Sequence, residues 1–209
     1  MMLREMILAF PAILFGLTFH EYSHAFMANI MGDKTAKYAG RLTLNPLPHI
    51  DILGLLSLLF FRFGWAKPVP INPLNMRSQR IGVLLVSIAG PLSNFILAFI
   101  IGILVRLLSP TLEQNMALHY MLTFAVIINL ILAFFNLIPL PPLDGSKILF
   151  SIFNTPLETQ IMLERIGPIV LLAVIIFGGL SGFNILWIFI GKAVIFFSRL
   201  FTGLNYGGV

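Results

Sequence analysis

Long apolar runs separated by short polar or basic stretches dominate the chain. The first run covers about residues 6–31 and ends at Gly32-Asp33, and two more cover about residues 81–108 and 117–138. At ~1.5 Å of rise per residue, each run is long enough to cross a hydrocarbon core of ~30 Å as a helix. The pattern therefore predicts helices that span a membrane.

Two other apolar stretches are less regular. Residues 52–61 are too few to span, so we expect a re-entrant or interfacial segment there. Residues 166–200 contain a glycine-rich break at 178–182, which fits either one long span or a tight pair. We expect residues 1–209 to form a single membrane-embedded domain, with a core at about 6–150 and a C-terminal helix or helix pair at about 160–200.

Residues 33–80 form a mixed region with seven of the thirteen basic residues, so the positive-inside rule predicts that it faces the cytoplasm. Residues 38–44 alternate with period 2, which predicts an amphipathic strand, and the two prolines of residues 67–71 favour an unpaired or edge strand. The predicted fold is an all-α polytopic membrane protein: about 4–6 transmembrane helices and a small membrane-associated β-hairpin or sheet on the cytoplasmic side.

The composition supports a membrane protein. Hydrophobic residues make up 58% of the chain and charged residues 10%, whereas soluble domains have about 25% charged residues. The net charge of +5 is spread between apolar runs rather than gathered on one solvated face, which argues against nucleic-acid binding. Cysteine is absent, so any metal must be bound by histidine and carboxylate ligands.

The first apolar run has some features of a secretory signal peptide. Arg4 precedes it, and residues 23–25 fit a small-x-small cleavage site. However, the polar pair His20-Glu21 interrupts the region that a signal peptide keeps apolar. We therefore expect this segment to remain as a membrane helix.

That helix contains the sequence His20-Glu21-Tyr22-Ser23-His24. Residues four apart share one face of a helix, which lets two imidazoles bind one ion. Glu21 flanks that face and can take a proton from water bound to the metal. The arrangement is that of a zinc protease, with His20 and His24 as metal ligands and Glu21 as catalytic base.

Other interpretations of this cluster remain open. A five-residue pattern with three fixed positions also occurs by chance, but three ionisable side chains in one turn are costly inside a membrane and mark a functional site. A metal or proton transporter could use the same cluster as an ion pathway. A transporter needs polar residues continuing across the membrane, and the second apolar run has almost none at residues 97–104.

Two imidazoles leave a catalytic zinc one protein ligand short. Asp51 and Asp144 are the carboxylates at suitable depth, and Asp144 follows a helix that arrives at the side of the membrane where His20 and His24 lie. Asp144 is therefore preferred as the third ligand. A turn-forming Asp-Gly pair after a helix is the alternative explanation.

Several segments together resemble the site-2 protease family of intramembrane zinc metalloproteases. Beyond the histidine motif, they are Gly40-Arg41-Leu42-Thr43-Leu44-Asn45-Pro46, Gly64-Trp65-Ala66-Lys67-Pro68-Val69-Pro70, Ala89-Gly90-Pro91-Leu92-Ser93-Asn94 and residues 136–145. The resemblance implies one Zn²⁺ bound by the two motif histidines and the aspartate of Leu-Asp-Gly, and a catalytic glutamate that Glu21 matches. It covers about residues 10–150.

The same resemblance suggests that Asn136 lies near the scissile carbonyl, where its amide could donate to a developing oxyanion. A hydrogen bond to a neighbouring helix explains an intramembrane asparagine equally well. Asn94 has a weaker claim, and Gly90-Pro91 is expected to allow close packing or a helix irregularity near the site. His49 and Asp51 could support a ligand, although capping or interfacial solvation explains them better.

The expected activity is hydrolysis of peptide bonds within or near the transmembrane helices of membrane-protein substrates, which are the expected partners together with the lipid bilayer. An extended substrate could add to the segments at 38–44 and 67–71. An inactive relative that binds helices without cutting them is a further alternative. We expect a multi-pass protein of the plasma membrane with its active site toward the cytoplasm. No part of the chain is long and polar enough for the PDZ or CBS domain of many relatives.

Overall fold

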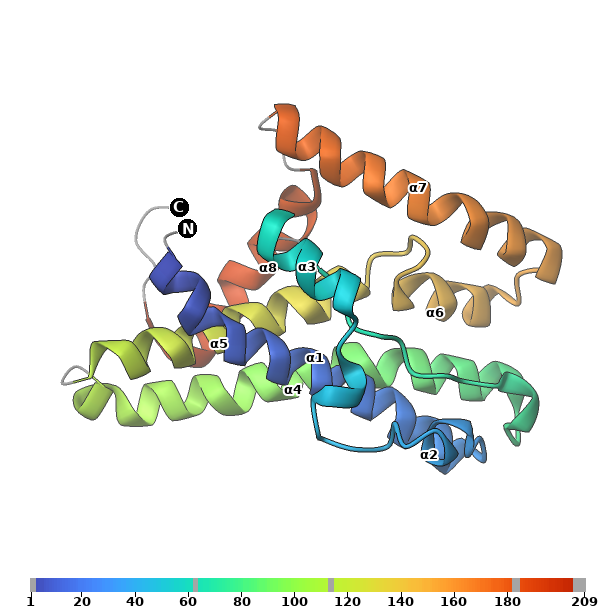
Figure 1. The fold of residues 1–209 in the computed structure, drawn as a ribbon, viewed down its shortest axis with the longest axis horizontal. Helices are drawn as coiled ribbons and strands as arrows, with labels where there is room; N and C mark the ends of the chain where they lie inside the picture. Colours follow the sequence, from blue (N-terminus) through green and yellow to red (C-terminus); the bar gives the residue numbers. More distant parts are fainter. Residues whose placement is uncertain (1–2, 62–63, 113–114, 182–184, 205–209) are drawn as a thin grey trace.

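A computed structural model describes residues 3–61, 64–112, 115–181 and 185–204 (Figure 1). The regular structure of these residues is helical. In chain order the elements are α1 (Leu3–Met31), α2 (Thr35–Tyr38), η1 (Leu47–His49), α3 (Ile52–Phe61), η2 (Pro73–Asn75), α4 (Gln79–Leu112), α5 (Met116–Asn136), α6 (Asp144–Phe153), α7 (Leu157–Ser181) and α8 (Ile185–Thr202).

Three helices in the described part of the chain are long and apolar enough to cross a membrane. They are α4 over Gln79–Leu108, α5 over Met116–Asn136 and α7 over Leu157–Gly179. The prediction of a mostly helical membrane protein is therefore confirmed, whereas the total of about 4–6 spans stays a prediction. The stretch 166–200, left open between one span and two, is divided between α7 and α8.

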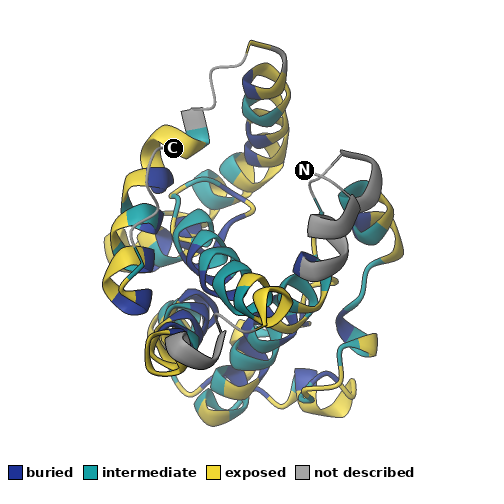
Figure 2. Cartoon of the chain, turned by 90° about the vertical axis from the view of Figure 1, so that its left-hand side faces the viewer, coloured by how far each residue is buried: buried dark blue, intermediate teal, exposed yellow. Residues whose placement is uncertain are grey.

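The long helices α1, α4 and α5 pack against one another, and α4 also contacts α6 and α8 (Figure 1). Buried apolar side chains of α4, α5 and α8 form the main core, which consists of Ala98, Val126, Leu130, Val194 and Phe201. By contrast, α7 lies at the margin of the bundle (Figure 1), and many of its side chains are exposed, as they are elsewhere on the outer helices (Figure 2). Helix α4 thus packs against helices from both the N-terminal and the C-terminal half of the chain.

The strand predicted over residues 38–44 does not form. Tyr38 ends α2, and Gly40 follows with a φ of +68°. Tyr38 is 79% exposed, whereas Arg41 is buried and donates to the Lys67 carbonyl, so burial here does not follow the alternation of apolar and polar residues. In the described residues the sole β-bridge pairs Ile50 with Ala66, so the predicted hairpin or sheet is not confirmed.

A buried carboxylate fixes the chain after α1. Asp33 is fully buried and accepts hydrogen bonds from Thr35, from the Asn72 main chain and from the Asn75 amide. Burial acts to raise the pKa of Asp33, but these hydrogen bonds outweigh it and hold the pKa below its usual range. The end of α1 is therefore tied to residues 72–75, which lead into α4.

Candidate metal centre

Three side-chain atoms from two distant elements converge inside the bundle. His20 and His24 lie one turn apart on α1, and their Nε2 atoms are 3.0 Å apart. Asp144, the first residue of α6, places its Oδ2 atom 3.2 Å from each of these nitrogens. All three residues are buried, so the structure brings together the three ligands predicted from the sequence.

The remaining ring nitrogens show which atoms can bind a metal. His24 Nδ1 lies 2.7 Å from the Val86 carbonyl oxygen, which can only accept, so Nδ1 carries the proton. His20 Nδ1 likewise donates to Asn94 Oδ1 at 2.6 Å. In neutral imidazoles both Nε2 atoms then present lone pairs toward the Asp144 carboxylate. Three converging acceptors repel one another unless a cation lies among them.

A chain of amides supports His20 from behind. Asn94 is fully buried and donates through Nδ2 to the Gly16 carbonyl and to Asn129 Oδ1, and Asn129 donates to the Ala125 carbonyl. These acceptors fix the Asn94 amide so that its oxygen faces His20. From the sequence, Asn94 has only a weak claim to a role and Asn129 is not singled out, although Asn129 lies seven residues before Asn136 on the same face of α5.

A glycine on α4 leaves room beside the ligands. A Cβ atom at Gly90 would lie 2.5 Å from His24 Nε2 and 2.6 Å from His20 Nε2. These distances are far inside van der Waals contact, so any side chain there would fill the space that the three ligand atoms face. The close packing at Gly90, one of the two expected roles, is thus packing against His20 and His24, the predicted metal ligands.

Contacts at both ends of α6 position Asp144, the first residue of this helix. A Cβ at Gly145 would collide with the Leu137 and Ile138 carbonyl oxygens, so the glycine lets the start of α6 pack directly on the chain that leaves α5. At the other end of α6, the Arg80 guanidinium donates to the Ser151 and Ile152 carbonyls. The Leu-Asp-Gly sequence therefore serves close packing and presents the carboxylate.

The donor atoms fit a zinc ion. Three ligands of a tetrahedral zinc at ~2.0–2.1 Å stand about 3.3 Å apart, and the three separations here are 3.0, 3.2 and 3.2 Å. Two imidazoles and one carboxylate are a usual protein ligand set for a catalytic zinc, which keeps its fourth position open.

The two residues predicted to act in catalysis lie outside this triangle of ligands. Glu21 is half-buried, and its Oε2 atom accepts a hydrogen bond of 2.9 Å from the Val69 main-chain N–H. Asn136 ends α5, and its amide donates to the Leu132 carbonyl one turn earlier. The structure thus gives Glu21 a tertiary contact and Asn136 a contact within its own helix.

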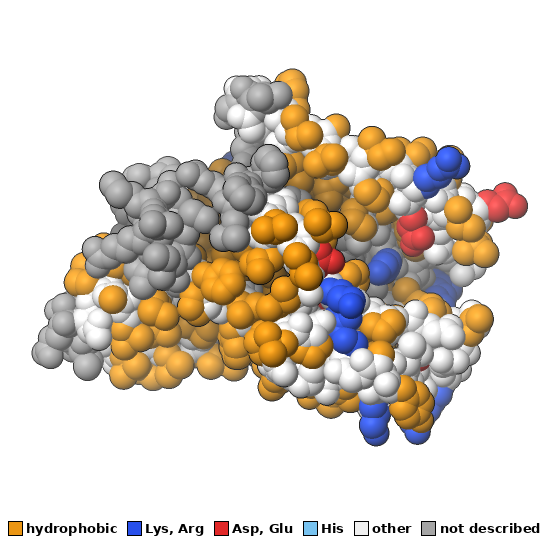
Figure 3. All heavy atoms as spheres, in the orientation of Figure 1, with side chains coloured by type: hydrophobic (Ala, Val, Ile, Leu, Met, Phe, Trp, Pro, Cys, Tyr) orange, Lys and Arg blue, Asp and Glu red, His pale blue; other side chains and the backbone are white. Residues whose placement is uncertain are grey.

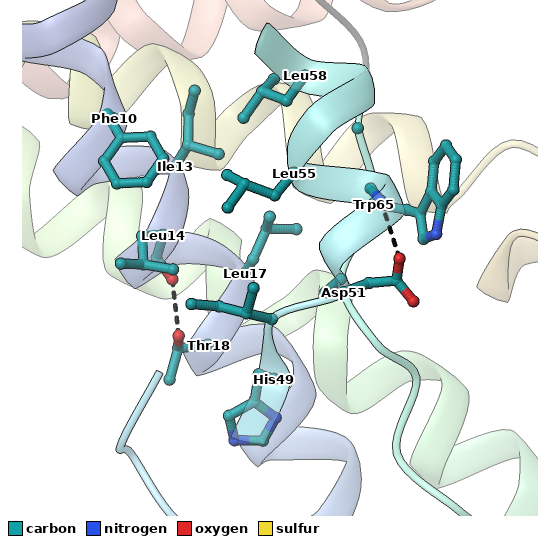
Figure 4. Close-up of a pocket in the computed structure, with 14 residues that line it drawn as sticks. Phe10, Ile13, Leu14, Leu17, Thr18, His49, Asp51, Leu55, Leu58 and Trp65 are labelled. Carbon is teal, nitrogen blue, oxygen red and sulfur yellow. Dashed lines mark hydrogen bonds between the residues drawn. The ribbon is translucent and has the colours of Figure 1, made fainter. Parts of the chain in front are cut away.

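An apolar pocket lies between α1 and α3, and its lining does not include His20, His24 or Asp144 (Figure 4). Leu17 and Thr18 of α1 line it, and so do His49 and Asp51. His49 Nε2 donates to the Thr43 carbonyl, and Asp51 accepts from the Gly54 N–H at the start of α3. Asp51 therefore caps a helix, and neither residue contacts a metal ligand through these bonds.

Comparison with known proteins then identifies the family. A model described as peptidase family M50 matches residues 108–178. The "Putative zinc metalloprotease YwhC" of Bacillus subtilis is 39% identical to the chain over 181 residues, which are 84% of this chain and 82% of that protein. The chain belongs to peptidase family M50. The resemblance to site-2 proteases is thereby confirmed.

Two archaeal relatives extend the comparison. In Methanocaldococcus jannaschii, "Putative zinc metalloprotease MJ0611" is 32% identical over 68% of this chain and 69% of that protein. "Zinc metalloprotease MJ0392" of the same organism is 29% identical over 90% of this chain but only 48% of its own length. No solved structure gives a significant match. The family assignment and the relatives' names support a metalloprotease, and zinc as its metal.

Proposed function

We propose that this chain is an intramembrane zinc metalloendopeptidase that cuts within or near the transmembrane helices of other membrane proteins. The observation that carries the proposal is the convergence of two imidazoles and a carboxylate, 3.0–3.2 Å apart and buried in an apolar helical bundle. Such a cluster is costly in a membrane unless it binds something. Membership of family M50 supports the same function.

His20, His24 and Asp144 are the proposed zinc ligands. When bound, zinc supplies Lewis acidity, which polarises the scissile carbonyl and makes water more acidic near neutral pH. Asn94 and the Val86 carbonyl hold the imidazoles in the tautomer that leaves both Nε2 atoms free for the metal.

Glu21 is the proposed general base. It follows His20 on α1, and its Oε2 atom is engaged by the Val69 N–H, whereas Oε1 has no hydrogen bond in the described part of the chain. Oε1 therefore takes the proton from the attacking water and later delivers it to the leaving amide nitrogen. Asn136 is proposed to donate to the oxyanion through the Nδ2 hydrogen that does not bond the Leu132 carbonyl.

The substrate must be locally unwound, because a helical peptide bond is already hydrogen-bonded within its own segment. The structure does not favour strand addition along residues 38–71. Residues 38–44 are not a strand, the N–H groups of Lys67 and Val69 are already bonded, and Pro68 and Pro70 have none. The pocket between α1 and α3, lined mostly by apolar side chains, suits an apolar substrate side chain instead.

The proposed orientation places the metal ligands toward the cytoplasm of a plasma membrane, within one domain whose catalytic core covers about residues 6–150. Charged side chains gather toward one end of the molecule in Figure 3, and apolar side chains dominate the visible surface next to it. Basic residues on that end agree with the positive-inside rule.

Cleavage of a model transmembrane helix by the detergent-purified protein tests the function. The wild type should bind one equivalent of zinc and cut, and Glu21→Gln should bind zinc without cutting because the amide cannot accept the proton. Glu158→Gln, the same chemical change at an exposed residue of α7, is the matched control and should do both. Cutting that persists without zinc, or absence of cutting with zinc transport into vesicles, would contradict the proposal.

A further inference from the structure

The segment Pro68-Val69-Pro70 presents one amide N–H to the proposed catalytic base. Proline has no N–H, so Val69 supplies the only main-chain donor of these three residues. That donor lies 2.9 Å from Glu21 Oε2. A hydrogen bond to a carboxylate is shorter and stronger than one between neutral groups.

Packing places this amide independently of the hydrogen bond. The Val69 side chain is buried in a cluster with Ala25 and Ala36, against which Leu42 and Ile71 also pack. Ala25 stands four residues after Glu21 and so shares a face of α1 with it. The same face therefore contacts Val69 twice, through an apolar side chain and through a carboxylate.

Two further contacts hold the chain just before Val69. The Lys67 carbonyl accepts from the guanidinium of Arg41, and the Lys67 N–H donates to the His49 carbonyl at 2.9 Å. Arg41 is buried, and its Nε has no hydrogen-bond partner, so the guanidinium is committed to this carbonyl in the described structure. The segment is thus anchored on both sides of Pro68.

We propose that the Val69 main-chain amide is a positioning group for Glu21, an inference that rests on the proposed role of Glu21 as general base. By holding Oε2, the amide restricts the rotation of a flexible side chain and directs Oε1 toward the proton it must move. The Glu21 side chain then loses its conformational freedom when the protein folds, and not in the transition state. Such positioning matters because a misplacement of a catalytic group by 1 Å can lower the rate about 100-fold.

An amide-to-ester change isolates this contact. Cell-free translation with 2-hydroxy-3-methylbutanoic acid at position 69 replaces the Val69 N–H by oxygen and keeps the side chain. The matched control is the corresponding ester at Ile71, two residues later, whose N–H has no hydrogen bond in the described structure. Val69→Pro compared with Val69→Ala repeats the test genetically, because alanine keeps the N–H.

The ester at position 69 should lower kcat by about tenfold or more, with KM within about twofold and one equivalent of zinc retained. The Ile71 ester should retain the wild-type kcat, KM and zinc content. Equal kcat values for the two esters would overturn the inference, and so would a higher kcat, which would make the contact a brake. Loss of zinc or a change confined to KM would assign Val69 a structural role instead. If the wild type itself does not cut, the proposed function fails and this inference fails with it.

Discussion

Gly90→Ala should weaken zinc binding severely while the helices remain folded. The new Cβ would stand 2.5 Å from His24 Cε1 and Nε2 and 2.6 Å from His20 Nε2. Non-bonded carbon contacts are ordinarily ~3.5–4.0 Å, so the imidazoles or the backbone of α4 must move by about 1 Å. Zinc–ligand distances tolerate about 0.2 Å, and we therefore expect a loss of at least about 100-fold in zinc affinity.

Folding itself should be less affected by Gly90→Ala. Alanine is the better helix former by about 1 kcal/mol, which partly offsets the steric cost within α4. Gly102→Ala provides the matched control on the same helix, because its Cβ would lie 2.5 Å from Phe201 Cβ, at the contact with α8. In both variants the new Cβ collides with a neighbouring side chain at a similar distance. Only in Gly90→Ala does that side chain belong to the proposed ligands.

Zinc affinity measured by competition with a chromophoric chelator, together with thermal unfolding in detergent, separates the two effects. Gly102→Ala should lower the unfolding temperature and keep its zinc, whereas Gly90→Ala should lose zinc and cleavage together. Wild-type zinc affinity in Gly90→Ala would refute the assignment of this space to the metal. If both variants lose zinc equally, the loss of zinc affinity in Gly90→Ala reflects general destabilisation of the fold.

Three further changes test other parts of the structure. Asn94→Ala should weaken zinc binding about 10–100-fold in the same competition assay, because His20 loses its hydrogen-bond partner. Asn136→Ala should lower kcat by about 100-fold or more at unchanged zinc content, and an unchanged kcat would leave Asn136 with a structural role. The low pKa of Asp33 means that its ionised form stabilises the fold above its ordinary pKa, and this contribution is lost as the pH falls through the folded pKa. Wild-type thermal stability should therefore decline below about pH 4 more steeply than that of Asp33→Asn, which should be less stable at neutral pH.

The proximity of His20, His24 and Asp144 could be predicted because strong physical rules act on these positions. Helical periodicity places His20 and His24 on one face, and the cost of burying charge in a membrane makes an accidental cluster improbable. Topology then narrows the choice of third carboxylate to the side of the membrane where Asp144 lies. These arguments need only the order of the apolar segments and the depth of each residue within its segment, and both can be read from the sequence.

The segment at residues 38–44 could not be predicted in the same way. Its alternation covers few residues, and long-range contacts decide which side chains are buried. Arg41 goes inside because the Lys67 carbonyl, 26 residues away, accepts its hydrogen bond, and Tyr38 is left outside. Asn94 was undervalued for a related reason: a polar residue in an apolar helix signals a partner, but nothing in its spacing says that the partner is His20.

The separation of the ligands along the chain bears on how the protein is made. Asp144 lies 124 residues after His20, so a ribosome synthesises both histidines, and all of α1 and α4, well before the carboxylate. Until Asp144 is added, the growing chain has only two of its three proposed metal ligands, so the proposed zinc site stays incomplete. The proposed enzyme is therefore complete only once α6, which begins at Asp144, has packed against α4, so activity would have to follow synthesis of at least the first 144 residues.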